Sequence, residues 1–187
     1  MTAHHHRRIR TICRALLILV ACLPGRRALA QEVDAPPISR VRSEDPSITA
    51  LIERGLTHSP TFHRLVASVE TSDGIAYVEL GRCPPRVAAC LLTWMKSSGG
   101  NRFMRIVVNR ERLGSDWRLL VAIGHELQHV LEVLDDRFVT DGRKMFFFYQ
   151  QYAPTMQAQF ETQAAINAGL SIRTELHVWR RPVASQP

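Results

Sequence analysis

Cysteine is scarce in this 187-residue chain, and the few cysteines present exclude several classes of site. Of the four cysteines, Cys13 and Cys22 fall within the first 30 residues. The other two, Cys83 and Cys90, have six residues between them. That spacing does not match the Cys-x-x-Cys pattern of redox proteins, and a zinc site built from cysteines needs more of them. We therefore expect one disulfide that closes a short loop.

The chain also lacks an apolar run of the ~20 residues that a membrane-spanning helix requires. Its N-terminal apolar segment covers only residues 15–23, follows four arginines and precedes a small-x-small cleavage site at Ala28-Leu29-Ala30. This order is typical of an export signal. It predicts a signal peptide over residues 1–30 and a periplasmic or secreted mature protein. An envelope lipoprotein, anchored through Cys22 of Leu-Val-Ala-Cys, is the alternative.

Without the predicted signal peptide, the chain carries almost no net charge. The whole chain carries a net charge of +7, but six of its basic and none of its acidic residues precede Gln31. The remaining chain has a net charge of +1, which gives no support to a nucleic-acid partner or a membrane surface. The sequence shows neither an internal repeat nor a low-complexity tract.

The pattern of apolar residues predicts one domain of the α+β class. We expect a flexible leader over residues 31–46, which contain three prolines, then a domain over residues 47–180 and a tail over residues 181–187. Apolar residues at helical spacing predict two short helices, or one broken helix, between Ile48 and Val69.

Three strands should follow these helices, at residues 75–80, 89–95 and 102–109. The connections between them are short, so the pattern predicts a small antiparallel meander. A helix from Ser115, which is a good N-cap, should then run through Leu134. Further helices are expected from about Lys144 to Tyr152 and from about Met156 to Trp179.

The helix that follows the strands carries the string His125-Glu126-Leu127-Gln128-His129. Residues four apart on a helix differ by about 40° in direction and about 6 Å in rise, so both imidazoles can point at one metal ion. Glu126 is rotated by about 100° from His125, where its carboxylate can act as a general base towards a metal-activated water. The surrounding residues are apolar nearly all round the helix, and buried polar groups need partners.

A catalytic zinc usually takes three protein ligands, and three carboxylates compete for the third position. Glu132 lies on nearly the same face as the histidines, which suits an outer role. Asp135 completes a string that resembles metzincin-like enzymes, although Glu132 stands where those enzymes have a helix-breaking glycine. Glu161 lies on a separate predicted helix, where Ala164 and Ala165 permit close approach. We predict that Glu161 is the third ligand; an ordinary surface glutamate is the alternative.

The pairing of His-Glu-x-x-His with the later Glu161-Thr162-Gln163-Ala164 resembles the gluzincin branch of zinc metallopeptidases. The resemblance covers roughly residues 115–170. It implies that His125, His129 and Glu161 bind Zn²⁺, that Glu126 is the general base and that the fold is zincin-like. It also implies that a peptide substrate lies along an edge strand, for which we expect residues 102–109.

The sequence therefore predicts an exported zinc peptidase of unknown substrate. The rival hypothesis is a catalytically silent zincin-like domain of the cell envelope that binds metal or a partner protein. Gluzincins often supply a further group that stabilises the oxyanion, and Tyr149, Tyr152 and His177 are the candidates here. His58 and His63 are interpreted as structural residues.

Overall fold

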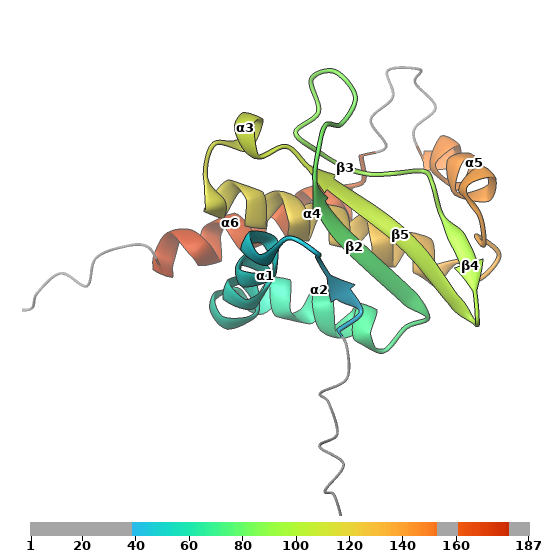
Figure 1. Ribbon diagram of the computed structural model, residues 1–187, viewed down its shortest axis with the longest axis horizontal. Coiled ribbons are helices and arrows are strands. Elements are labelled where there is room, and N and C mark those ends of the chain that lie inside the picture. The colour runs from blue at the N-terminus through green and yellow to red at the C-terminus, as the bar shows by residue number, and fades with distance from the viewer. Residues whose placement is uncertain (1–38, 153–160, 180–187) are drawn as a thin grey trace, which may run out of the picture. The chain divides into compact units, whose positions relative to one another are not determined.

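The computed structural model describes residues 39–152 and 161–179. These residues confirm the α+β class, with strands and helices alternating irregularly along the chain (Figure 1). The strands are β1 (Val41–Arg42), β2 (Gly74–Leu80), β3 (Ala89–Leu91), β4 (Lys96–Ser98) and β5 (Asn101–Val108). The helices are α1 (Pro46–His58), α2 (Pro60–Glu70), α3 (Arg110–Leu113), α4 (Asp116–Asp135), α5 (Gly142–Tyr152) and α6 (Gln163–Trp179).

Several expectations concern residues outside the described ranges. They are the signal peptide over residues 1–30, the lipid anchor at Cys22, most of the leader and the tail over residues 181–187. In the part of the chain that is described, no helix combines the length and the apolar character that crossing a membrane would need.

The described domain includes residues that the sequence assigned to a flexible leader. Strand β1 lies within residues 31–46, the expected leader, yet it pairs in parallel with β2 through the register Val41↔Ala76. The Val41 side chain is buried in the core. Asp45 then caps α1, because its Oδ1 accepts the backbone N–H of Ser47 at 2.8 Å. Residues 39–46 therefore belong to the domain, and only the part of the leader before them stays a prediction.

The predicted antiparallel meander is wrong, because the sheet is mixed. Its order is β1-β2-β5-β3, with β4 also paired to β5. Strands β2 and β5 are parallel neighbours, whereas β3 and β4 pair with β5 in antiparallel fashion. The loop after β2 carries the chain past the position that β5 later fills, so β3 lies on the far side of β5. The strand predicted at residues 102–109 is thus the central strand β5 (Asn101–Val108), and its buried run Ile106-Val107-Val108 suits that position.

The turn between β4 and β5 has the short geometry that the sequence predicted. Gly99 and Gly100 adopt φ angles of 56° and 76°, the left-handed values that a two-residue hairpin of type I′ requires. The strand predicted at residues 89–95 is β3 alone (Ala89–Leu91), and the separate strand β4 (Lys96–Ser98) makes the hairpin with β5. Local turn chemistry therefore gave the right pairing here, while the longer connection after β2 carried no such signal.

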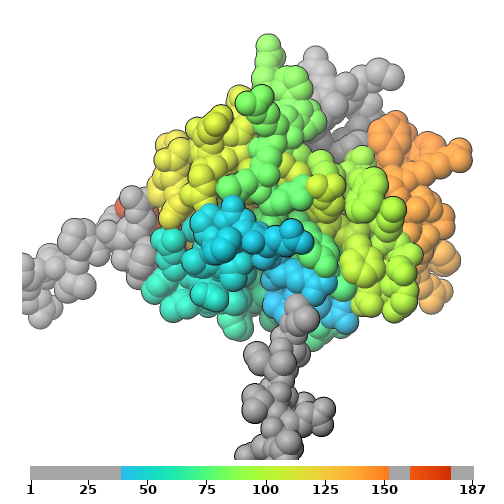
Figure 2. Space-filling model, viewed as in Figure 1, coloured from blue at the N-terminus to red at the C-terminus, as the bar shows by residue number. Residues whose placement is uncertain are grey.

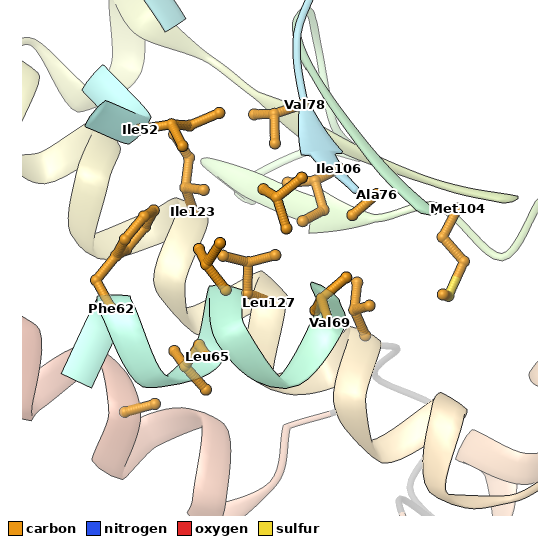
Figure 3. Packing of buried hydrophobic residues seen from close by; sticks show 14 of the residues in the cluster. Ile52, Phe62, Leu65, Val69, Ala76, Val78, Met104, Ile106, Ile123 and Leu127 are labelled. Atoms are coloured by element: carbon orange, nitrogen blue, oxygen red, sulfur yellow. The ribbon is translucent and has the colours of Figure 1, made fainter. Parts of the chain in front are cut away.

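One face of the sheet is covered by helices, and the core lies between them (Figure 1). Side chains of α2 and α4 point towards those of β2 and β5, with Phe62 and Ile123 on the helical side and Val78, Met104 and Ile106 on the strands (Figure 3). All five are buried. Burial alternates along β5, so its other face remains partly exposed. The core thus holds the buried side of α4 against the sheet.

Arg102, at the start of β5, ties the C-terminal end of α4 to the sheet. Its guanidinium is nearly fully buried and pairs with both carboxylate oxygens of Asp73, at 2.9 and 2.8 Å. The same group donates to the carbonyls of Val133 and Leu134 at 3.0 and 2.7 Å, which leave the last turn of α4. A helix end has carbonyls without intrahelical partners, and a cation there also meets the negative end of the helix dipole.

We predict that Arg102→Met lowers the free energy of unfolding by about 2–4 kcal/mol, because it leaves buried carbonyls without a donor and removes a buried guanidinium from its half-exposed partner Asp73. Arg105→Met is the matched control on the same strand. Arg105 pairs with Glu79 on the partly exposed face, so its loss should cost only about 0–1 kcal/mol. Urea denaturation followed by circular dichroism measures both, and equal losses would contradict the role given to Arg102.

Candidate metal centre

Helix α4 presents the two motif histidines to the same point in space. It runs from Asp116 to Asp135 without a break, close to the predicted bounds. The ring centroids of His125 and His129 lie 5.0 Å apart. His129 is buried and His125 is partly exposed. The apolar surroundings predicted for the motif are present, since Ile123, Leu127 and Val130 are buried. The i, i+4 spacing therefore brings the two imidazoles together, as the sequence predicted.

Glu161 is the carboxylate that joins the histidines. Its Oε2 lies 3.3 Å from His125 Nε2, and one possible ligand atom from each of His125, His129 and Glu161 lies within 4.8 Å of the others. The expectation that Glu161 lies within a helix is wrong. Helix α6 begins at Gln163, and Thr162 caps it by accepting the Ala165 backbone N–H at 3.1 Å. Glu161 thus immediately precedes the cap.

The donor set fits a zinc ion. Zinc holds histidine nitrogens and carboxylate oxygens at ~2.1 Å in a tetrahedron, so neighbouring ligand atoms are roughly 3.4 Å apart. The distance of 3.3 Å between His125 and Glu161 matches that spacing. Because all three atoms already lie within 4.8 Å of one another, small rotations of the side chains suffice for the remainder. Two imidazoles and one carboxylate leave a fourth position open, as catalytic zinc sites do.

Glu132 supports the site from outside. Its Oε2 lies 2.8 Å from His129 Nδ1, which leaves Nε2 of that ring to face a metal. Its other oxygen accepts the hydroxyl of Thr162 at 2.5 Å. Glu132 therefore orients His129 and also holds the residue that follows Glu161. Carboxylates that hydrogen-bond to ligating histidines fix the ring orientation and raise ligand basicity.

Asp135 does not take part in the cluster. It is exposed at the last position of α4 and is absent from the group of possible ligands among the described residues. Since α4 continues through Glu132 without a break, nothing folds Asp135 back towards His125. The metzincin-like alternative therefore lacks the helix break that it needs.

Glu126 lies beside the cluster in a buried position. Its Oε2 accepts the backbone N–H of Leu91 at 2.7 Å. Burial raises the pKa of the Glu126 carboxyl, while the nearby His129 and His125 act against this rise without cancelling it. The carboxylate therefore holds a proton more strongly than an exposed glutamate would, which is a property of general bases.

The ion pair between His125 and Glu161 shifts both groups. Burial by itself would lower the pKa of His125, but the hydrogen bond to Glu161 and the charges of Glu126 and Glu161 together raise it. The same hydrogen bond is the main reason that the pKa of Glu161 is lowered. Each partner thus stabilises the charged form of the other. In this arrangement the two groups form a pair that a divalent cation would replace.

Two cavities meet at the cluster, one on each side of it. One has a volume of about 200 Å³ and follows β3 towards Thr93. The other, of about 450 Å³, lies beside the start of β3. Ala89, Glu126 and Glu161 line both. The strand at the site is therefore β3, which lies at the end of the sheet order, and the expectation that residues 102–109 provide the edge is wrong.

The loop before β3 is closed by a disulfide between Cys83 and Cys90, as predicted. Their Cα atoms lie 5.9 Å apart. This loop projects from the top of the molecule next to β3 in the ribbon and space-filling views (Figure 1, Figure 2). The disulfide therefore limits the freedom of the wall that the two cavities share.

Two of the three candidates for an oxyanion donor, Tyr149 and His177, have side chains that the structure describes. Tyr149 is buried and lines the smaller cavity, but its hydroxyl donates to the carbonyl of His129 at 3.0 Å. His177 lies 14 residues after the start of α6, in its last turn, and is not in the group of possible ligands. The Tyr152 side chain is outside the described part of the structure. His58 and His63 are not in the cluster.

Close contact between α4 and α6 depends on residues that the sequence did not single out. A Cβ atom added at Gly124 would lie 2.1 Å from the Ile172 side chain, so this glycine lets the helices approach. Of the two alanines expected to do so, Ala165 is buried but Ala164 is exposed. The signal for Gly124 was its place between Ile123 and His125 on a buried helix, where a glycine otherwise costs helix stability.

No protein-family model, curated protein or solved structure matches this chain. The assignment of the site therefore depends on its own residues and their geometry.

We predict that Glu161→Ala removes stoichiometric zinc binding, because it deletes one of three ligands. Glu132→Ala should keep the stoichiometry and weaken affinity by about 10–100-fold, the range typical of outer-sphere carboxylates. Asp135→Ala is the matched control and should bind as the wild type does. Competition with a chromophoric chelator measures the three affinities. Zinc binding that survives Glu161→Ala but fails in Asp135→Ala would reverse the assignment.

Proposed function

We propose that this protein is an exported zinc-dependent peptidase. The observation that carries the proposal is the convergence of His125, His129 and Glu161 within 4.8 Å, with Glu126 buried beside them. The position of this group where two cavities meet favours a catalytic site over a purely structural one. The N-terminal segment with its arginines, apolar run and cleavage site supports export.

Under this proposal, His125, His129 and Glu161 hold the metal, and Glu132 keeps His129 in orientation. A zinc ion in such a site supplies Lewis-acid chemistry, because it lowers the pKa of a bound water and polarises a carbonyl. Glu126 accepts the proton of the attacking water at its carboxylate and delivers it to the departing amine. The N–H of Leu91 donates to Glu126 Oε2, so β3 has a backbone group directly at this base.

The backbone of β3 offers a place for a peptide. In its pairing with β5, the Ala88 carbonyl and the Leu92 N–H point towards β5, so Ala89 and Leu91 direct their backbone groups to the other side. That side faces Glu126, as the bond from Leu91 shows. An extended peptide that pairs with this edge would pass directly in front of the three possible ligands. A peptide bond is therefore the substrate that this site favours.

A second candidate function is a silent zincin-like domain, in which the same residues bind metal or form an ion pair only. The contact between His125 and Glu161 at 3.3 Å favours it, because the two side chains can pair with each other. The buried Glu126 argues against it, since a structural zinc site is closed by four ligands and needs no base beside an open position.

We predict one zinc ion per chain, since the described residues contain one group of this kind. His125→Ala and His129→Ala should each abolish stoichiometric binding, whereas His63→Ala, an exposed residue on α2, should leave it unchanged. Elemental analysis of the purified protein after dialysis measures the metal content. A wild type that retains no zinc would contradict the proposal and leave only an ion pair between His125 and Glu161.

We predict that Glu126→Gln keeps zinc and loses hydrolysis, because an amide of nearly the same size cannot accept the water proton. Glu53→Gln makes the same chemical change on an exposed position of α1 and should leave activity intact. Cleavage of a broad peptide library, read by mass spectrometry, compares the two. Undiminished cleavage by Glu126→Gln would rule out this base, and no cleavage by the wild type would favour the silent domain.

A further inference from the structure

The larger of the two cavities at the site is rich in arginine. Its volume of about 450 Å³ lies within the usual range for ligand pockets, roughly 300–1,000 Å³. Part of its lining is apolar and includes Leu113, Trp117 and Val121. The lining also contains Arg86, Arg118 and Arg173, from three different parts of the chain.

The three guanidinium groups are exposed in the cavity, and that of Arg118 lies over the Trp117 ring at 5.3 Å from its centroid. Arg86 belongs to the disulfide-closed loop, Arg118 to the first turns of α4 and Arg173 to α6, and all three are exposed. None of the ion pairs among the described residues involves any of them. The acidic residues in the lining are Glu126 and Glu161, which belong to the metal centre. The outer part of the cavity therefore carries positive charge without an acidic counterpart.

The backbone at Arg86 is a second, independent sign of function. Val87 donates its N–H to the Pro84 carbonyl at 3.1 Å, which closes a turn with Arg86 at its third position. Arg86 has φ of 72° and is the one non-glycine residue in the described ranges with a positive φ. A turn of this kind favours glycine at that position. An arginine there is strained, and strained backbone of this sort gathers at functional sites.

The direction of β3 tells which end of a bound peptide would enter this cavity. The arginine-lined cavity lies at the N-terminal end of β3, next to Arg86 and Ala89, and the smaller cavity lies towards Thr93. Antiparallel pairing is the slightly more stable arrangement for an added strand. A peptide bound antiparallel to β3 therefore directs its C-terminal residues towards the arginines.

We propose that this cavity binds a substrate carboxylate on the C-terminal side of the scissile peptide bond. The carboxylate comes either from an aspartate or glutamate side chain or from the C-terminus of a short peptide, and the shared chemistry is an anion held by guanidinium groups. This inference deepens the proposed function and rests on it for the position of the scissile bond. Arg118 and Arg173 act as specificity-determining residues, and Arg86 closes the far wall.

Peptide binding tests the cavity without any need for hydrolysis. The protein is the zinc-loaded Glu126→Gln full chain, and the probes are fluorophore-labelled short alanine peptides. One carries glutamate and an amidated C-terminus, one carries glutamine and a free C-terminus, and one carries glutamine and an amidated C-terminus. Fluorescence anisotropy should show about tenfold tighter binding of a peptide with a carboxylate than of the uncharged peptide. The stronger of the two charged peptides identifies the source of the carboxylate.

Arginine variants in the same background locate the effect. Arg118→Gln and Arg173→Gln should each remove most of the carboxylate preference, and added salt should weaken it in the parent. Arg143→Gln, an exposed position on α5, is the matched control and should keep it. Arg86→Gly should lose preference yet raise the melting temperature, because glycine relieves the left-handed backbone. A change of fold would not produce that combination.

Hydrolysis by the wild type distinguishes a failure of the carboxylate site from a failure of the peptidase proposal. Cleavage with glutamate preferred C-terminal to the cut, read by mass spectrometry, supports the inference. Carboxylate-dependent binding without cleavage supports the cavity and defeats the peptidase proposal. Cleavage without any preference for a carboxylate, or preference for one N-terminal to the cut, overturns the inference while the peptidase stands. Equal binding of all three peptides, or binding of none, also overturns it.

Discussion

The arrangement of the site depends on how α4 is fixed, and the buried guanidinium of Arg102 fixes its far end. Arg102 lies at the start of the central strand β5, and it binds the last carbonyls of α4 and the carboxylate of Asp73 at once. A helix held at one end by a rigid group can still pivot, but the core contacts of Ile123 and Leu127 prevent that. His125 and His129 therefore have a defined position relative to the sheet, and with it a defined distance from β3.

The second ligand-bearing segment is tied to the first by Glu132. One oxygen of this carboxylate hydrogen-bonds to His129 and the other to Thr162. A shift of the start of α6 would therefore also shift the ring of His129. A further tie at the opposite end of α6 joins Glu175 to Thr61 at 2.7 Å, and Glu175 also accepts the hydroxyl of Ser59. Helix α6 is thus held at both ends, which suits a helix that immediately follows a possible metal ligand.

The sequence was informative where the physics is local. The i, i+4 spacing of His125 and His129 and the turn at Gly99-Gly100 each determine geometry within a few residues, and the structure agrees with both. The α+β class followed from hydrophobic periodicity. The pairing of β2 with β5 was missed because the order of strands in a sheet depends on contacts between distant residues. The same limit applies to Arg102, whose partners at Asp73 and Val133 lie about 30 residues away on either side. Helix geometry favoured Glu161 over Glu132 and Asp135 as the third ligand. The structure places Glu161 just before α6, which begins at Gln163.

The free side of β3 has a consequence for solubility. A strand that leaves backbone groups open to one peptide also leaves them open to the same strand of another molecule, which is how sheets grow into aggregates. Strand β3 contains only three residues, and the disulfide at Cys90 anchors it within a closed loop. The carboxylate of Glu126 occupies the N–H of Leu91 and places a buried charge opposite the edge. A second copy would have to displace that carboxylate and would gain only a short ladder in return, which disfavours pairing between two copies of this strand.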